Sequence, residues 1–166
     1  MIRAAIALEE LKNQLLVWRQ EGKKIVFTNG VFDILHLGHA TYLEAAASYG
    51  DILIVGINSD SSVKRLNKGP ERPIHIAEDR ARLLTALRSV SAVIIFDDDT
   101  PLELIQHVQP DVLVKGGDYD AEDADAVSPK YIVGSAEVKQ SGGRVATIPL
   151  LAGHSTTKIL QSKVGG

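Results

Sequence analysis

The sequence predicts a doubly wound α/β domain, in which a mainly parallel five-stranded sheet carries helices on both faces. Short β-rich runs alternate with segments of helical spacing, which is typical of βαβ units. The run from Ile52 to Val55 is apolar throughout, as expected of a parallel strand that is covered on both faces. The 166 residues are 45% hydrophobic, so we expect one domain with one continuous core over residues 1–166.

The predicted elements follow one another in a regular order. Apolar residues recur at helical spacing until Gly22, so residues 1–22 are expected to form an N-terminal helical extension. Strands are expected at residues 25–27, 52–57, 93–96, 112–114 and 145–148. Helices are expected over residues 37–49 and 77–88, from Thr100 as N-cap with Pro101 at the first helical position, and from Ser155 onward. This order predicts a Rossmann-like sheet.

Two polar segments directly follow predicted strands. Residues 58–76 and 115–129 are rich in Gly, Pro, Ser and charged residues, and we interpret both as loops. Ligands of such sheets bind beyond the carboxyl ends of the strands, where the strand order reverses. We therefore expect both segments to be active-site loops.

Charge and composition exclude several classes of protein. A formal net charge of -3 leaves no excess of basic residues for a polyphosphate backbone, so we expect no nucleic-acid partner. The chain has no cysteine, which excludes disulfides and a thiol nucleophile and fits a cytoplasmic location. Glu9 and Glu10 interrupt the first apolar stretch, and no run approaches the roughly 18 residues that span a bilayer, so we expect no membrane association.

One motif at the end of the first predicted strand indicates phosphate binding. A glycine just past a strand lets the backbone approach phosphate oxygens, and amide groups at a helix N-terminus attract anions. His36 and His39, three residues apart on one helix face, add donors for charge that develops in a transition state. Gly38 between them leaves a flat surface for a base or ribose. The full motif reads Gly30-x-Phe32-Asp33-x-x-His36-x-Gly38-His39.

Alternatives exist for single residues of this motif. A histidine pair at this spacing also occurs in metal sites and on plain surfaces, but the preceding strand and glycine favour a phosphate site. Phe32 is expected in the core. Asp33 either positions backbone amides of the loop or helps to hold a metal, and we favour the positioning role.

The motif resembles the signature of the cytidylyltransferase-like nucleotidyltransferase superfamily, and Gly153-His154-Ser155-Thr156-Thr157 resembles its second motif. Ser155 also has a simpler interpretation as a helix N-cap. The resemblance implies that the following residues bind the nucleotide: Thr28, Asn29, Gly30, Phe32, Gly38, Gly153, Ser155, Thr156 and Thr157.

A narrower resemblance, to the adenylyltransferases of ADP-heptose synthesis, covers nearly the whole chain from Lys24 onward. It implies ATP and D-glycero-β-D-manno-heptose 1-phosphate as substrates, Mg²⁺ held mainly by the substrate phosphates, and a role in lipopolysaccharide inner-core synthesis. In many bacteria this activity is half of a bifunctional protein with a kinase, for which this chain has no room, so we expect the stand-alone form.

Relatives are commonly dimers or larger, which implies a homo-oligomer. Leu150 stands where some relatives carry an arginine, so other cations must neutralise the phosphates there. The segments that carry the resemblance are residues 27–39, 58–66, 69–73, 79–80 and 110–119, and the Ser-Thr-Thr end.

The expected reaction needs charge neutralisation more than a base. The phosphate oxygen of a sugar 1-phosphate is already anionic, so in-line attack on the α-phosphorus requires mainly positioning. We assign His36 and His39 to the triphosphate, and Lys68 to a mobile loop that closes over it. Asp79 and Arg80 are either a surface pair or cap, or substrate ligands. Residues expected to bind phosphate or sugar are Asp33, Lys64, Arg72, Lys115, Gly116 and Asp118.

Two other functions stay open at this point. A cytidylyltransferase that acts on glycerol 3-phosphate or a similar alcohol phosphate would use the same motifs, because base choice depends on a few backbone contacts. A nucleotide-sensing module would bind ATP without turnover. The clustered histidines and lysines disfavour the sensor, since binding alone needs fewer transition-state donors.

Overall fold

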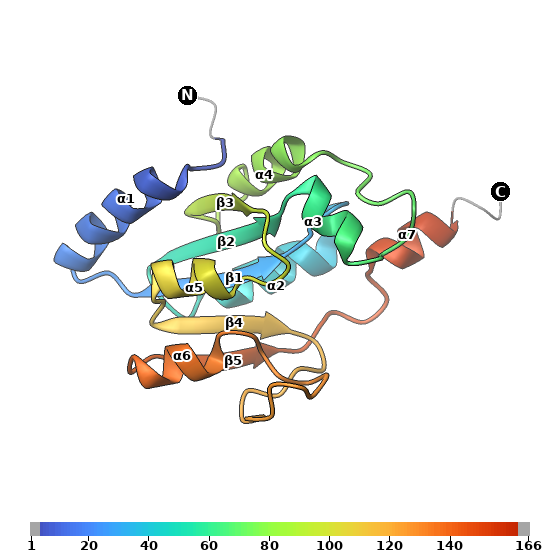
Figure 1. Ribbon diagram of the computed structural model, residues 1–166. Helices are drawn as coiled ribbons and strands as arrows, with labels where there is room; N and C mark the ends of the chain where they lie inside the picture. Colours follow the sequence, from blue (N-terminus) through green and yellow to red (C-terminus); the bar gives the residue numbers. More distant parts are fainter. Residues whose placement is uncertain (1–3, 163–166) are drawn as a thin grey trace.

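The computed structural model describes residues 4–162 as a parallel sheet with helices packed against it (Figure 1). This arrangement confirms the predicted α/β fold, with all four strand pairs of the described chain parallel. The strands are β1 (Ile25–Gly30), β2 (Ile52–Asn58), β3 (Ala92–Phe96), β4 (Val112–Gly116) and β5 (Arg144–Ile148). The helices are α1 (Leu8–Gln20), α2 (Leu37–Ala47), α3 (Asp60–Arg65), α4 (Ala77–Thr85), α5 (Leu102–Val108), α6 (Ser135–Gln140) and α7 (Thr156–Ser162).

The strand order is β3-β2-β1-β4-β5, which reverses direction between β1 and β4. Ile25 pairs with Ile52 on one side of β1, and Val26 pairs with Val112 on the other. A crevice forms at such a reversal because the two neighbouring connections leave in opposite directions. The carboxyl ends of β1 and β4 are therefore the place where this topology positions a ligand.

Each face of the sheet has its own apolar core. Val26 and Val55 belong to the core under α2 and α4, whereas Phe27 and Ile54 belong to the core under α1, α5 and α6. Successive residues of a strand point to opposite faces, so a strand covered on both sides is apolar at most of its positions. The continuous apolar runs and the two-sided helix layers thus have one physical cause (Figure 1).

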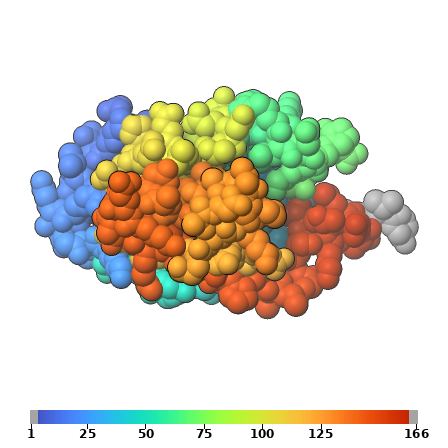
Figure 2. All heavy atoms as spheres, turned by 60° about the horizontal axis from the view of Figure 1, so that its bottom comes forward, coloured from blue at the N-terminus to red at the C-terminus, as the bar shows by residue number. Residues whose placement is uncertain are grey.

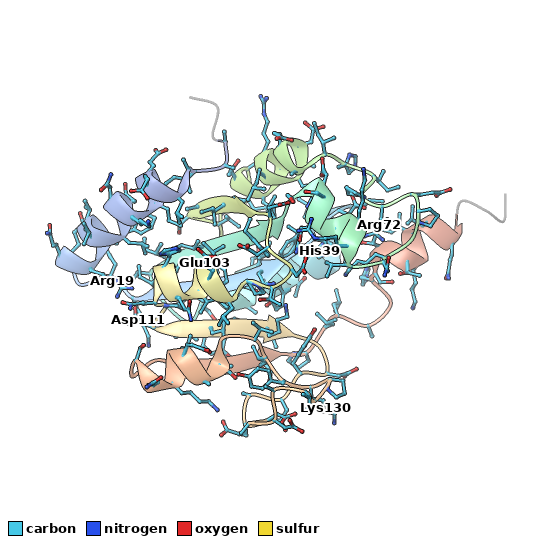
Figure 3. The ribbon with its side chains drawn as sticks, in the orientation of Figure 1. Arg19, His39, Arg72, Glu103, Asp111 and Lys130 are labelled. Atoms are coloured by element: carbon cyan, nitrogen blue, oxygen red, sulfur yellow. The ribbon has the colours of Figure 1, made fainter. Side chains whose placement is uncertain are left out.

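The first helix belongs to one of these layers. Leu11 and Leu15 of α1 are buried in the core that α5 also covers. Arg19 donates hydrogen bonds of 2.7 Å to the carbonyls of Val108 and Gln109, at the end of α5. Figure 3 shows Arg19 and Asp111 at the end of the sheet opposite to His39 and Arg72. No helix within residues 4–162 has the length and apolar character to cross a membrane.

The helices differ from the prediction in several places, since α2 and α4 end at Ala47 and Thr85, earlier than expected. The segment 58–76 is no uninterrupted loop, because α3 begins after Ser59, whose hydroxyl accepts a hydrogen bond from the Ser62 amide at 3.1 Å. Helix α6 was not predicted. Helix α5 begins at Leu102 with Pro101 as its N-cap, so the predicted capping at Thr100 was wrong by one residue.

Arg80 has neither of its expected roles, surface pair or substrate ligand. Its side chain is fully buried and donates hydrogen bonds to the carbonyls of Val31 at 2.8 Å and His75 at 2.9 Å. It also forms an ion pair of 2.8 Å with Asp60 at the start of α3. Arg80 therefore joins the segments that follow β1 and β2. Asp79 beside it is exposed.

The connection between β4 and α6, residues 117–134, is the longest polar segment near the carboxyl ends of the strands. Its backbone folds back on itself, with hydrogen bonds from the amide of Asp120 to the carbonyl of Lys130 and from Tyr131 to Ser128. In the space-filling view it forms the orange surface beside the red C-terminal segment (Figure 2). We refer to residues 117–134 as the β4–α6 loop.

Candidate active site

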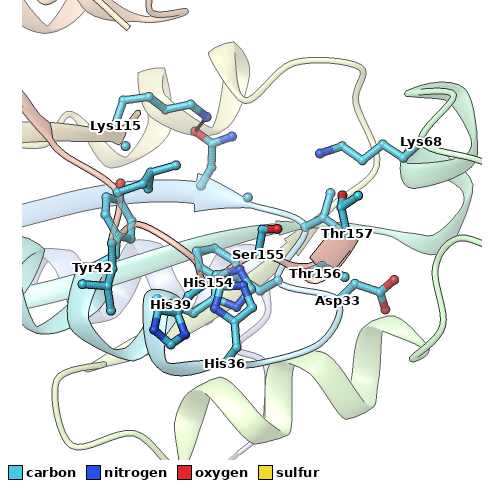
Figure 4. Close-up of a pocket in the computed structure, with 18 of the residues that line it drawn as sticks. Asp33, His36, His39, Tyr42, Lys68, Lys115, His154, Ser155, Thr156 and Thr157 are labelled. Atoms are coloured by element: carbon cyan, nitrogen blue, oxygen red, sulfur yellow. Dashed lines mark hydrogen bonds between the residues drawn. The ribbon is translucent and has the colours of Figure 1, made fainter. Parts of the chain in front are cut away.

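A cleft of about 550 Å³ opens at the carboxyl ends of β1 and β4. Its size lies in the range of small-molecule sites in proteins. The walls come from the end of β1, the start of α2, the loop after α3, the end of β4 and the segment before α7 (Figure 4). Predicted site residues that line it are Asn29, Gly30, Phe32, Asp33, His36, Gly38, His39, Lys68, Arg72, Lys115, Gly116, Ser155, Thr156 and Thr157.

Four predicted site residues do not line this cleft. Thr28 is fully buried, and its hydroxyl lies 2.7 Å from that of Tyr42. Lys64 is exposed on α3, and Asp118 is exposed beside a separate surface hollow that Lys130 also lines. Gly153 has a φ of 84° in the turn before α7, a conformation that favours glycine. Thr28 and Gly153 therefore shape the cleft from outside it.

The two histidines lie together at the start of α2. His36 is the N-cap residue, and the His36 and His39 rings stack with centroids 3.8 Å apart. Gly38 permits this arrangement, since a Cβ there would lie 2.9 Å from the His36 ring. The Nδ1 atoms of both histidines are buried and have no hydrogen-bond partner among the described residues. Buried polar atoms in native proteins almost always have partners, so two unpartnered nitrogens in one stacked pair mark this pair as an unusual feature of the cleft.

Both imidazoles are neutral at pH 7. Burial and then the neighbouring His36 lower the pKa of His39 to about 4, against a smaller opposing effect of the Ile34 backbone. Burial and then His154 also lower the pKa of His36. Desolvation favours the uncharged form of an imidazole. A neutral imidazole still donates one hydrogen bond, so the pair can bind phosphate oxygens without carrying charge.

Positive charge in the cleft comes from lysines. Lys115 Nζ lies 3.4 Å from Asn29 Oδ1 and 5.3 Å from the centre of the Tyr119 ring. Burial and then the charge of Lys68 lower the pKa of Lys115 to about 8. Partial burial and then Arg72 lower the pKa of Lys68. In Figure 4 the two ammonium groups point toward each other across the cleft, an arrangement that an anion between them would stabilise.

Asp33 holds the loop that carries Lys68. Its side chain is fully buried, forms an ion pair with Arg72, and accepts hydrogen bonds of 2.9 Å from the amides of Ile74 and His75. Burial raises the pKa of Asp33, but these hydrogen bonds outweigh it and leave the pKa below its usual value. Both oxygens are therefore engaged by the loop, which is the positioning role that we favoured. Arg72 is held by Asp33 in the same contact.

The protein groups of the cleft do not form a magnesium site by themselves. Asp33 is the one carboxylate among the cleft-lining residues of the described chain, and its oxygens already accept bonds from the loop. Within residues 4–162 no group of three or more histidine, aspartate or glutamate residues is arranged to hold a metal ion. Magnesium prefers several oxygen ligands in octahedral geometry. Mg²⁺ held by substrate phosphates stays a prediction.

Several residues that line the cleft were not among the predicted site residues. Tyr42 lies three residues after His39 on the same face of α2, so helical spacing could have revealed it. Burial raises its pKa to about 12, and its hydroxyl is therefore a neutral group. Leu150 packs on Gly116, where a Cβ would lie 2.8 Å from the leucine side chain. The sequence had drawn attention to Leu150 because some relatives carry an arginine there, but it did not predict this packing on Gly116. Val31, Leu151 and His154 complete the group.

The fold and the cleft agree with the family to which the sequence belongs. Residues 27–162 match the family model described as Cytidylyltransferase-like. The chain is a nucleotidyltransferase and belongs to the cytidylyltransferase-like family.

Within this family, the chain is similar in sequence to HldE proteins. The chain is 52% identical over 154 residues to the Bifunctional protein HldE of Methylobacillus flagellatus, covering 93% of this chain and 30% of the relative. It is 49% identical over 153 residues to HldE of Syntrophotalea carbinolica, and this match covers 92% of this chain and 29% of that relative. The chain thus spans about 30% of the length of these curated relatives.

A solved structure shares the fold. The lipopolysaccharide core biosynthesis protein of Thermoplasma volcanium superposes with a TM-score of 0.59 at 28% sequence identity. The match covers 78% of this chain and 98% of that protein. The α/β fold described above is therefore present in a crystal structure of a related protein.

Proposed function

We propose that the chain transfers the adenylyl group of ATP to D-glycero-β-D-manno-heptose 1-phosphate, which gives ADP-heptose and pyrophosphate. The observation that carries this proposal is the stacked pair of His36 and His39 in one cleft with Lys68 and Lys115. The choice of substrates is supported by the similarity to HldE proteins and to a lipopolysaccharide core biosynthesis protein. The proposal assigns the chain to lipopolysaccharide inner-core synthesis in the cytoplasm.

The proposed reaction is a single in-line displacement. An oxygen of the sugar phosphate forms a bond to the α-phosphorus of ATP while the bond from that phosphorus to the α,β-bridging oxygen breaks. The electron pair of the broken bond leaves with pyrophosphate. Since the attacking oxygen is anionic at pH 7, no group of the protein has to remove a proton. The protein contributes positioning and charge stabilisation.

The residues divide these tasks. His36 and His39 donate hydrogen bonds to the triphosphate, with His39 nearest to the α-phosphate, and the hydroxyls of Ser155, Thr156 and Thr157 bind its distal oxygens. Lys68 and Lys115 stabilise the negative charge that gathers where the two substrates meet. Mg²⁺ carried by the substrate phosphates would neutralise further charge.

Product analysis tests the proposal. The purified chain is incubated with Mg²⁺, each nucleoside triphosphate in turn, and heptose 1-phosphate, glucose 1-phosphate or glycerol 3-phosphate. Pyrophosphate release is followed and the coupled product is identified by mass. We expect ADP-heptose from ATP. Turnover of CTP with glycerol 3-phosphate would show that the chain is a nucleotidyltransferase with other substrates than those proposed. Nucleotide binding without any turnover would contradict the proposal.

A further inference from the structure

A second cavity, of about 350 Å³, lies directly beside the cleft. The two share lining residues at the end of β1, and both are lined by Lys68 and Lys115. The remaining walls come from the end of β2, the segment before α5 and the β4–α6 loop. A group held between the two lysines would therefore face both spaces at once. Nothing in the reaction as assigned above uses this second cavity.

The walls of the second cavity combine flat apolar surfaces with polar groups. Tyr119, Pro129 and Tyr131 of the β4–α6 loop supply the flat surfaces, and Asn58 and Thr100 supply polar groups. The amide nitrogen of Asn58 donates a 3.0 Å hydrogen bond to Ser62, which fixes the orientation of the amide. A sugar ring presents C–H faces that pack on aromatic rings and hydroxyls that need hydrogen-bond partners. This set of walls matches such a ring.

The charges around the cavity indicate where the phosphate of such a ligand would lie. Asp99 is the one carboxylate among the cavity-lining residues of the described chain, and Arg65 neutralises it at 2.6 Å. Lys68 and Lys115 are the cationic residues of the same lining. A ligand with a neutral ring and an anionic end would place its anionic end at the lysines, on the border with the cleft.

The loop that forms the aromatic wall has a fixed anchor. Ile132 is 2% exposed and belongs to the core under α5 and α6, directly after Tyr131 in the chain. The backbone bonds between Asp120 and Lys130, and between Ser128 and Tyr131, close the loop on itself. The backbone of Tyr131 is therefore held in place by the fold.

From these observations we propose that the second cavity binds the sugar ring of the acceptor, with Tyr131 and Tyr119 as determinants of sugar affinity and the acceptor phosphate between Lys68 and Lys115. The nucleotide then occupies the larger cleft, on the histidine side of the lysine pair. This inference rests on the proposed function, because it takes the acceptor to be a sugar 1-phosphate.

The test compares two substrates in three proteins. Heptose 1-phosphate is titrated calorimetrically into the full chain loaded with a non-hydrolysable ATP analogue, and KM values are measured for both substrates. For Tyr131→Ala we expect the Kd and KM of heptose 1-phosphate to rise about tenfold or more, with the KM of ATP nearly unchanged. Val127→Ala is the matched control, since Val127 lies on the same loop, is 89% exposed and does not line the cavity. It should behave as wild type.

Further variants keep the test decisive. Tyr131→Phe should retain most of the affinity if the ring packs on the sugar, and Tyr119→Ala, at a residue that is 39% exposed, serves if Tyr131→Ala does not fold. Unchanged affinity for heptose 1-phosphate in the alanine variants would overturn the inference, as would an equal loss for ATP or a wild-type protein that does not bind heptose 1-phosphate. If heptose 1-phosphate binds in a way that depends on Tyr131 but no ADP-heptose forms, the assignment of the second cavity is supported and the proposed function is contradicted.

Discussion

At the scale of single residues, hydrogen bonding and positive charge in the cleft come from different side chains. His36 and His39 are neutral at pH 7, because burial lowers the pKa of both imidazoles. Arg72 is already paired with the buried Asp33. Lys68 and Lys115 therefore supply the charge that faces an incoming phosphate, while the histidines act as oriented donors.

Replacement of His39 tests its role as a donor. We expect His39→Ala to lower kcat by roughly 10²- to 10³-fold, the usual effect of removing one donor from a developing charge. Steady-state kinetics measures kcat, and a circular dichroism spectrum checks that the variant is folded. His107→Ala is the control, because His107 lies on α5 near Glu103 and lines neither the cleft nor the second cavity. Equal activity of the two variants would contradict the assignment.

The low pKa of Lys115 predicts a pH dependence. Burial, followed by the charge of Lys68, lowers this pKa to about 8, so the ammonium group loses its proton as the pH rises through that value. We expect kcat/KM for the sugar phosphate to fall on the alkaline side with an apparent pKa of about 8, since kcat/KM reports the free enzyme. In Lys115→Arg the charge persists, and the fall should move to higher pH. A wild-type profile without this fall would show that Lys115 does not bind the substrate.

At the scale of elements, the active site depends on how two loops are held. Asp33, in the segment between β1 and α2, binds the loop after α3 through Arg72 and the amides of Ile74 and His75. Arg80 of α4 binds the same loop at the His75 carbonyl and also binds Val31. Both contacts fix the loop that carries Lys68 relative to the histidines. Lys68 is therefore placed by α4 and the β1–α2 segment as well as by its own loop.

Removal of the Asp33 charge tests this connection. We expect Asp33→Asn to lower the free energy of unfolding by roughly 3 kcal/mol, because it leaves Arg72 without its buried partner. The lowered pKa of Asp33 means that its stabilisation is present above the unfolded pKa and is lost as the pH falls through the lower folded value. Urea unfolding at neutral and acidic pH measures both effects. Asp79→Asn, the same change at an exposed residue, should have little effect, and an equal loss in both variants would contradict the account.

At the scale of the whole molecule, the sequence was informative where the signal is local. The strands were predicted from short β-rich runs, and the clearest of these is apolar throughout because a parallel strand covered on both faces is largely apolar, as in Ile52 to Val55. The glycine and histidine motif was also readable, since its members are neighbours in the chain. Both signals arise within about a dozen residues.

Features that depend on distant segments were not readable from the sequence. Helices α3 and α6 have six residues each, too few turns for an apolar period to stand out. Arginine is almost never fully buried unless it is paired, and the partners of Arg80 lie in three separate segments. Lys64 and Asp118 follow the expected strands, yet their side chains do not line the cleft. The second cavity combines the end of β2, the segment before α5 and the β4–α6 loop, which only the strand order brings together.

The central claim is that the phosphate of heptose 1-phosphate attacks the α-phosphorus of ATP. It is tested most directly by supplying heptose 1-phosphate whose non-bridging phosphate oxygens carry ¹⁸O, with unlabelled ATP, and weighing the products. The account predicts ADP-heptose that retains the full label and pyrophosphate that contains none. Label in pyrophosphate, or AMP with no ADP-heptose, would contradict it.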